Sequence, residues 1–209
     1  MIEWSIDALR ACESVRWIVV ATPPGHAHDL GGPDLEIVDG GATRCESVTN
    51  AMAAVDTELV AIHDAARPLL TAELVEELVA RLDADPEAAG VIAAAPVTDT
   101  VKQAGKASGP GTNDVFDTPE MTNASLVIEQ TLDRSQLWVA QTPQVFRTEA
   151  LRAALEVDAA TRDAATDEAM LVESAGGRVL IHPTPMENPK VTTPLDLKVA
   201  ELLLEGRPR

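Results

Sequence analysis

Short apolar runs alternate with longer segments of mixed polarity along most of the chain. The runs lie at 17–21, 35–38, 59–63, 90–96 and 179–182. Short apolar runs bounded by polar residues are typical of buried strands in a parallel sheet. We therefore predict one strand at each of these five positions.

Between the runs, apolar residues recur at helical spacing behind residues that favour a helix start. A capping-box pattern, a threonine before an apolar stripe, or acids in the first turn each mark a helix N-terminus. The predicted starts are Thr43, Thr71, Thr166 and Thr193, and a further helix is predicted over residues 1–11. Strands and helices in alternation predict an α/β fold, with a mostly parallel sheet and helices on both faces.

One stretch departs from this alternation. Residues 103–124 are rich in glycine and proline and contain few large apolar side chains. Such a composition predicts a loop or an excursion from the domain rather than part of its core. We predict a single domain over residues 1–209 with this excursion inside it.

Composition and charge narrow the classes of function. Of the 209 residues, 45% are apolar, which is enough for a substantial core. The net charge of −18 opposes a general attraction to nucleic acid or to anionic membranes, so neither partner is expected. No apolar run reaches the roughly 18 residues of a membrane span, and the two cysteines are too few for a disulfide framework. We predict a cytoplasmic protein with reduced thiols.

Polar motifs follow three of the predicted strands. They are Gly40–Arg44, which opens a helix, His63–Pro68 and Asp99–Lys102. The carboxyl ends of parallel strands are where open α/β sheets bind ligands, and a glycine turn before a helix can hold an anion. Each motif taken alone has a plainer explanation: a simple turn, or an ion pair between Asp64 and Arg67 that closes the loop.

Two further motifs lie in the second half of the chain. Residues 141–146, with two glutamines and a threonine around Pro143, are typical of a rigid polar turn that connects strands. Lys190 is one of only four lysines and lies among turn residues before the last helix, where it could face a phosphate, although a solvated surface lysine is the commoner case. No metal-ligand spacing and no serine-centred nucleophile motif occurs, so we predict no protein metal site and no covalent catalysis.

Seven motifs occur in an order that is far more specific than any one of them. They are GGATRCESV, HDAARP, PVTDTVK, LDRSQLW, AQTPQVF, ATDEAMLVESAGG and NPKVTTPLDL. In this order the chain resembles the 2-C-methyl-D-erythritol 4-phosphate cytidylyltransferase family from about residue 1 to residue 204. The resemblance implies a Rossmann-like nucleotidyltransferase fold, a homodimer and a reaction that depends on Mg²⁺ held mainly by the CTP phosphates.

The implied reaction joins CTP to a polyol phosphate and releases pyrophosphate, as a step of non-mevalonate isoprenoid precursor synthesis. Two alternatives remain: CMP transfer to another polyol phosphate, such as ribitol 5-phosphate, and a truncated remnant without catalysis.

The resemblance also implies roles for individual residues. Lys190 is expected to face the reacting phosphates. The cytosine and ribose pocket is expected at Gly41, Ala42 and Ser47, where Ala42 replaces an acidic residue often found in the family. The residues expected around the polyol and its phosphate are Asp64, Arg67, Thr100, Arg134, Thr142 and Thr166.

Two regions differ from the family pattern. Residues 100–135 match the protruding β-arm through which family members embrace a partner subunit, bringing Thr100 and Arg134 into the neighbour's site, and here the arm carries a longer insert. Family members begin with a strand and a Gly-rich loop that wraps the CTP triphosphate, and residue 1 matches the helix after that loop. We expect the chain as written to bind CTP poorly, to turn over slowly or not at all, to leave two strands without a partner, and to be of low stability.

Overall fold

A computed structural model describes residues 1–26, 30–106, 126–185 and 188–206 of the chain. The chain divides into two compact units. The first consists of Met1–Ala95 with Ala140–Arg209, and the second of Pro96–Val139.

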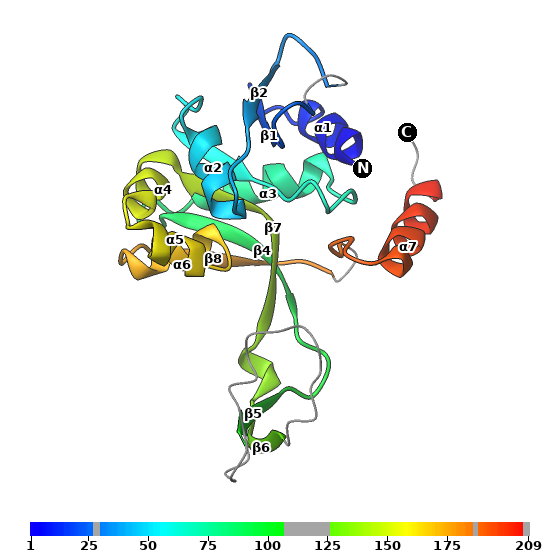
Figure 1. The fold of residues 1–209 in the computed structure, drawn as a ribbon, viewed down its shortest axis with the longest axis vertical. Coiled ribbons are helices and arrows are strands. Elements are labelled where there is room, and N and C mark those ends of the chain that lie inside the picture. Colours follow the sequence, from blue (N-terminus) through cyan, green and yellow to red (C-terminus); the bar gives the residue numbers. More distant parts are fainter. Residues whose placement is uncertain (27–29, 107–125, 186–187, 207–209) are drawn as a thin grey trace. The chain divides into compact units, whose positions relative to one another are not determined.

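Strands and helices alternate through the first unit, and a hairpin fills much of the second (Figure 1). The strands are β1 (Ile18–Thr22), β2 (Leu35–Asp39), β3 (Leu59–Ile62), β4 (Gly90–Pro96), β5 (Lys102–Lys106), β6 (Leu126–Thr131), β7 (Trp138–Arg147) and β8 (Val179–Pro183). The helices are α1 (Ile2–Arg10), α2 (Arg44–Met52), α3 (Ala72–Asp83), the 3₁₀ turn η1 (Arg134–Gln136), α4 (Thr148–Leu155), α5 (Ala159–Ala164), α6 (Glu168–Ser174) and α7 (Pro194–Glu205).

The first unit contains a four-stranded sheet in the order β3-β7-β4-β8 and a two-stranded sheet of β1 and β2. β4 and β8 run parallel with Gly90 opposite Val179, whereas β3 and β7 run antiparallel with Leu59 opposite Arg147. β1 and β2 are parallel, with Ile18 opposite Leu35. The predicted α/β architecture is confirmed.

Apolar side chains cover both faces of the four-stranded sheet, because successive residues of a strand point to opposite sides. On one face, Val91 of β4 packs with Leu78 and Leu82 of α3. On the other face, its neighbour Ile92 packs in the cluster that contains Leu151 of α4 and residues of α2 and α6. α3 therefore packs on one face of the sheet, and α2, α4 and α6 pack on the other.

All five predicted strands are present within one residue of their expected bounds. Thr43, Thr71 and Thr193 are N-caps whose hydroxyls accept backbone hydrogen bonds, and Thr193 forms a complete capping box with Asp196. The predicted start at Thr166 is wrong by one residue, because the side chain of Asp167 caps α6 by accepting from the backbone N–H of Met170.

The prediction of a polar turn at 141–146 is wrong. These residues lie inside β7, a strand of ten residues with a cis Thr142–Pro143 peptide bond. Their polar side chains are buried and mostly paired: Gln144 Nε2 donates to Asp167 Oδ2, and the hydroxyl of Thr184 donates to Gln141 Oε1. Hydrogen bonds of this kind let a polar sequence occupy an interior strand.

The second unit is built around an antiparallel pair of strands, β5 and β6. Residues 103–106, which were expected in a loop, belong to β5, while residues 107–124 lie outside the described part of the chain. Leu126, Val127 and Ile128 of β6 are exposed apolar residues. The unit thus matches the position of the predicted arm.

The division of the first unit into two sheets falls between β1 and β3, and a cavity separates these strands. In the described part of the chain, each of the two strands therefore has one edge without a strand partner.

Candidate functional site

Asp64 lies directly beyond the carboxyl end of β3, in the loop that leads towards α3. The loop is folded by a turn in which the Arg67 N–H donates to the Asp64 carbonyl. A second loop docks on it, since the Val191 N–H donates to the Ala66 carbonyl. Two segments far apart in sequence thus meet at the end of the sheet.

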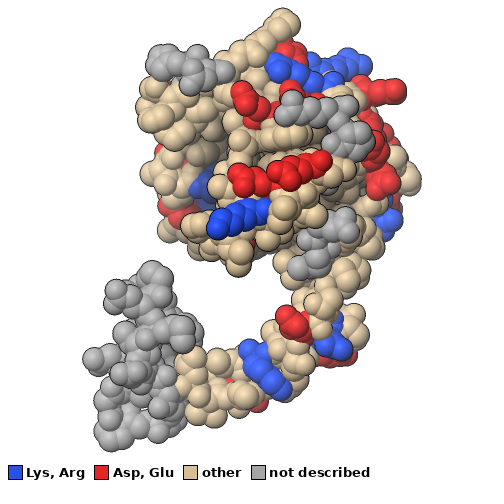
Figure 2. All heavy atoms as spheres, turned by 90° about the vertical axis from the view of Figure 1, so that its right-hand side faces the viewer, with Lys and Arg blue, Asp and Glu red and all other residues tan. Residues whose placement is uncertain are grey.

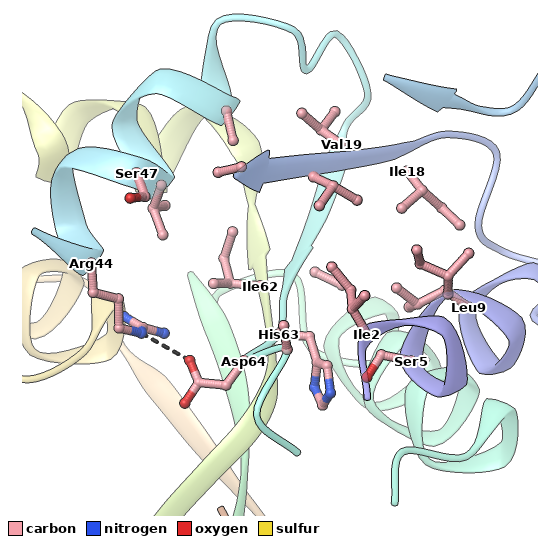
Figure 3. Close-up of a pocket in the computed structure, with 17 residues that line it drawn as sticks. Ile2, Ser5, Leu9, Ile18, Val19, Arg44, Ser47, Ile62, His63 and Asp64 are labelled. Atoms are coloured by element: carbon pink, nitrogen blue, oxygen red, sulfur yellow. Dashed lines mark hydrogen bonds and ion pairs between the residues drawn. The ribbon is translucent and has the colours of Figure 1, made fainter. Parts of the chain in front are cut away.

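The Asp64 carboxylate is the centre of a cluster of charges. Arg44 Nε donates to its Oδ1 at 2.9 Å, a contact that Figure 3 shows, and Lys190 Nζ lies 3.1 Å from its Oδ2. Burial opposes ionisation of this side chain, which is only 13% exposed, but Arg44 and Lys190 outweigh it and hold the pKa of Asp64 below its usual value. Asp64 is therefore an anion that accepts hydrogen bonds.

The ion pair between Asp64 and Arg67, which was the plainer explanation of this motif, is the longest of these contacts, with 3.9 Å between Arg67 Nε and Asp64 Oδ2. Arg67 instead donates from Nη1 to the Asn188 carbonyl, while its buried Nε has no hydrogen-bond partner among the residues that the structure describes. A buried cationic donor without a partner is costly and is an observation that favours an anionic ligand.

Arg44 also contacts a carboxylate on the far side of its guanidinium. Its Nη1 lies 2.7 Å from both oxygens of Glu168, the first residue of α6, whose side chain is 1% exposed. Burial raises the pKa of Glu168, and Arg44 opposes this rise. Glu168, Arg44, Asp64 and Lys190 thus form a continuous chain of alternating charges.

His63 and Thr142 fix the Asp64 loop through hydrogen bonds. The Asp64 N–H donates to the Thr142 hydroxyl, which lies 3.1 Å from His63 Nδ1. His63 Nε2 donates to the Arg67 carbonyl, which can only accept, so Nδ1 accepts from Thr142. Burial lowers the pKa of His63 to about 4, and the imidazole is therefore neutral near pH 7.

The Gly41–Ser47 segment lies beside this cluster and begins α2. The Gly41 N–H donates to the Ser47 hydroxyl, which itself donates to the Thr43 carbonyl. The Ala42 N–H donates to Glu46 Oε2 at 2.7 Å. The backbone donors predicted to meet a nucleotide are therefore engaged by neighbouring side chains and would have to exchange partners.

A cavity of about 260 Å³ is lined by Arg44, Ser47 and Asp64 among these groups (Figure 3). Its apolar part is lined by α1, β1 and β3, including Ile6, Val20 and Ile62, and its polar part reaches Arg44 and Asp64. Ser47 of α2 lines the same cavity. The predicted nucleotide residue Ser47 and the predicted polyol residue Asp64 thus share one hollow.

The cluster is locally basic in an acidic protein. Arg44, Arg67 and Lys190 supply three positive charges against the two carboxylates of Asp64 and Glu168, which leaves one positive charge. On the face of the first unit drawn in Figure 2, basic side chains form small separate groups among acidic ones. Anion binding at this site would therefore depend on local geometry rather than on a broad basic surface.

The structure brings several of the predicted residues together. Asp64, Arg67, Thr142 and Lys190 belong to one cluster, although the Thr142 hydroxyl is engaged within the protein. Thr166 is exposed, two residues before Glu168, and its hydroxyl lies 3.9 Å from Met170 Sδ. Thr100 and Arg134 belong to the second unit, where Arg134 Nη1 donates to the Thr98 carbonyl. Their place in a site stays a prediction.

Three residues of the cluster were not singled out from the sequence: Arg44, Glu168 and Asn188. Arg44 carried one signal, because a cation in the first turn of a helix opposes the helix dipole and needs a compensating partner. Asn188, whose Nδ2 donates to the Thr142 carbonyl, stood between residues of a quoted motif without a role of its own.

Among the described residues, no three His, Cys, Asp or Glu side chains lie together in a way that could hold a metal ion. In the same part of the chain, no helix has both the length and the apolar character that a membrane crossing requires.

Comparisons with known proteins agree on one family. The model of the family "2-C-methyl-D-erythritol 4-phosphate cytidylyltransferase" matches residues 1–120 and 111–206. The bifunctional enzyme IspD/IspF of Anaeromyxobacter dehalogenans is 38% identical over 97% of this chain and 49% of its own length. The cytidylyltransferase of Bordetella petrii is 37% identical over 96% of this chain and 84% of its own. The chain thus spans about half the length of the bifunctional relative.

Solved structures show the same relationship. The cytidylyltransferase of Thermus thermophilus superposes with a TM-score of 0.75 at 30% identity, covering 98% of this chain and 88% of that one. The Francisella tularensis structure gives a TM-score of 0.77 at 26% identity over 96% of this chain and 86% of that one. With the family model matched over most of its length, the chain belongs to the 2-C-methyl-D-erythritol 4-phosphate cytidylyltransferase family.

Proposed function

We propose that the protein transfers CMP from CTP to 2-C-methyl-D-erythritol 4-phosphate and releases pyrophosphate, and that it does so in the cytoplasm. The observation that carries the proposal is the group of three cations around Asp64 at the end of β3, beside the loop that opens α2. Two anionic substrates have to meet in such a reaction, and a hydroxyl-rich one needs an acceptor such as Asp64. The two free buried cysteines, Cys12 and Cys45, suit a reducing compartment.

In the proposed reaction, a phosphate oxygen of the polyol phosphate attacks the α-phosphorus of CTP in line. The bond between the α-phosphorus and the oxygen that bridges to the β-phosphate breaks, and pyrophosphate takes the electron pair. Catalysis then rests on positioning and on stabilising charge at phosphorus rather than on a covalent intermediate. Lys190, with its charge next to Asp64 and 43% of its side chain exposed, is suited to stabilise that charge.

The other residues would hold the two substrates. Gly41, Ala42 and Ser47 would bind the cytosine and ribose, with the Ala42 N–H released from Glu46. Asp64 would accept from polyol hydroxyls. Arg67, whose Nε has no hydrogen-bond partner within the described ranges, would bind the polyol phosphate.

We propose that Mg²⁺ arrives bound to the CTP phosphates. The described residues do not bring together the carboxylates of a dedicated cage, and Mg²⁺ commonly keeps several waters and binds through substrate phosphates. When bound, the ion would neutralise charge on the triphosphate. The chain's own part is to place the two phosphates and Lys190.

The test is pyrophosphate release from CTP and Mg²⁺ with methylerythritol phosphate. We expect pyrophosphate release that requires both CTP and the polyol phosphate, because the proposed reaction joins the two substrates in line without a covalent intermediate.

Ribitol 5-phosphate serves as the matched acceptor in parallel reactions. Equal or faster release with ribitol 5-phosphate would contradict the assignment of the substrate. No release with either acceptor would contradict the proposed activity itself.

We further propose that the protein is a homodimer in which Thr100 and Arg134 complete the partner's site. Support comes from the family resemblance and from the exposed apolar residues Leu126, Val127 and Ile128 on β6, since exposed apolar patches often mark an interface.

A mixing experiment tests this arrangement. Lys190→Ala and Arg134→Ala proteins should each be nearly inactive, whereas an equal mixture allowed to exchange subunits should recover about a quarter of wild-type activity, since half of the dimers then hold one intact site. If Arg134 served only its own chain, the mixture would stay inactive. Sedimentation of the mixture would verify that dimers are present.

A further inference from the structure

Glu168 is an almost completely buried acid that the proposed reaction does not use. Both of its oxygens lie 2.7 Å from Arg44 Nη1, and its side chain is 1% exposed. Burying a carboxylate is costly unless a cation compensates it. Within the described part of the chain, Arg44 is the cation that compensates Glu168.

Arg44 faces Asp64 with a different edge of the same rigid group. Its Nε donates to Asp64 Oδ1 at 2.9 Å, while Nη1 meets Glu168. The guanidinium is planar with its donors in fixed directions. A contact that fixes Nη1 therefore also fixes the direction in which the Nε–H points.

The two oxygens of Asp64 are consequently unequal. Oδ1 is held by Arg44, and Oδ2 is the oxygen nearest to Lys190, at 3.1 Å, and to Arg67, at 3.9 Å. Lys190 is partly exposed and can turn towards an anion. The Nε–H of Arg67 has no hydrogen-bond partner among the described residues, so it is available to an anion without a change of place. When these cations engage phosphates, Oδ2 becomes available to another donor.

We propose that Glu168 and Arg44 are positioning residues that hold Oδ1 of Asp64, so that Oδ2 is presented to a hydroxyl of the polyol phosphate. This inference rests on the proposed function. Arg44 would also keep Asp64 charged and compensated after Lys190 turns to the reacting phosphates, which lowers repulsion between Asp64 and the anionic substrates.

Steady-state kinetics of Glu168→Gln, measured beside the wild type, test the proposal. Glutamine keeps the shape of the side chain but removes the charge that fixes Arg44. We expect KM for methylerythritol phosphate to rise about 10-fold to 100-fold, the range for losing a charged hydrogen bond, with KM for CTP within about 3-fold of wild type. Arg44→Lys, which keeps the charge but not the two-edged contact, should give the same pattern.

A double-mutant cycle with Asp64→Asn shows whether Glu168 acts through Asp64. In the Asp64→Asn background, Glu168→Gln should cause little further loss, because the carboxylate that it positions is gone. Glu173→Gln, an exposed acid on the same helix, is the matched control and should leave both KM values unchanged. Independent, additive losses or an unchanged KM for the polyol phosphate would overturn the inference.

The same kinetics separate a structural role of Glu168, and a failure of the proposed function, from a failure of this inference. A purely structural role would lower the unfolding temperature or the amount of active protein, and kcat with it, without a selective change in the KM of one substrate. If the wild-type protein itself neither turns over nor responds to the polyol phosphate, the proposed function is wrong and this inference falls with it. Normal wild-type kinetics with an unaffected Glu168→Gln would overturn this inference alone.

The Arg44 Nε–H signal in ¹⁵N-resolved NMR gives a readout that needs no turnover. In the wild type it should be protected from solvent exchange at neutral pH, and it should be lost or strongly shifted in both Glu168→Gln and Asp64→Asn. A signal unchanged by Glu168→Gln would show that Glu168 does not orient Arg44, and the proposal would be abandoned.

Discussion

Replacing Lys190 with alanine should lower kcat for CMP transfer by about 100-fold to 1000-fold, the range found when one preorganised charge or donor to a transition state is removed. Negative charge develops around the α-phosphorus as the pyrophosphate leaves. Lys190 is the most exposed of the three cations in the cluster, with 43% of its side chain exposed against 33% for Arg44 and 12% for Arg67, and its Nζ lies 3.1 Å from Asp64. It can therefore reach a substrate from within the site.

The kinetic pattern distinguishes this role from that of a simple counterion for Asp64. If Lys190 were only a counterion for Asp64, its loss would weaken binding of the polyol and raise the KM for methylerythritol phosphate, with little change in kcat. Loss of a charge that stabilises the transition state lowers kcat. A rise in KM alone, with kcat unchanged, would therefore contradict the assignment of Lys190 to the reacting phosphates.

Lys198 offers a matched control for the same measurement, because it is an exposed lysine on α7. Lys198→Ala should leave kcat unchanged. Lys190→Arg should recover little activity, since a planar guanidinium does not replace a compact ammonium at a point contact. Thermal unfolding of each variant would show whether it is folded.

The strands that could be predicted from the sequence are those whose buried side chains are apolar. β4, with the sequence GVIAAAP, is buried on both faces and reads as an uninterrupted apolar run. β7 is equally interior, but Gln141, Thr142 and Gln144 break its apolar pattern, and their partners Thr184, Asp64 and Asp167 lie far away in sequence. The spacing of apolar residues along the chain does not reveal hydrogen bonds between residues that are distant in sequence. β5 and β6 also lack an apolar run, but in their case because they are largely exposed.

Some residues of the candidate site could likewise be predicted from the sequence, and others could not. Asp64, Arg67 and Lys190 follow strands or precede a helix, and general rules about sheet edges and loops indicate such positions. Glu168 lies 124 residues from Arg44, and nothing local distinguishes it from any acid in the first turn of a helix. Its burial, which is what makes it informative, exists only once α2 and α6 pack on the same face of the sheet.

The cavity between β1 and β3 lowers the free energy of unfolding that the fold can reach. Apolar residues of α1 and β1 pack together on one side of it but face the cavity on the other, and a side that faces a gap loses dispersion contacts. The chain also has few aromatic residues, two of them phenylalanine. The core that remains therefore depends strongly on single large side chains.

Replacing Phe146 with alanine should lower the free energy of unfolding by about 3 to 5 kcal/mol, the range for removing a buried aromatic ring. Phe146 is fully buried in β7, opposite Val60 of β3, in the cluster with Ile92 and Leu151. Urea unfolding followed by far-UV circular dichroism measures the loss as a lower midpoint at an unchanged slope. Because domains of this size are typically stable by only about 5 to 15 kcal/mol, the variant should be close to unfolding at 37 °C.

The surroundings of Phe146 explain why the cavity left by its removal should not collapse. Its ring lies over Gly90, where an added Cβ would come within 2.3 Å of the ring, so β4 already approaches β7 as closely as the backbone allows. Phe146→Leu should cost only about 1 kcal/mol, because leucine keeps most of the volume. Val199→Ala, at an exposed site on α7, should change stability by less than about 0.5 kcal/mol. A loss below about 1.5 kcal/mol for Phe146→Ala would mean that helices and sheet can close the gap, and that the two layers are less rigidly held than this packing indicates.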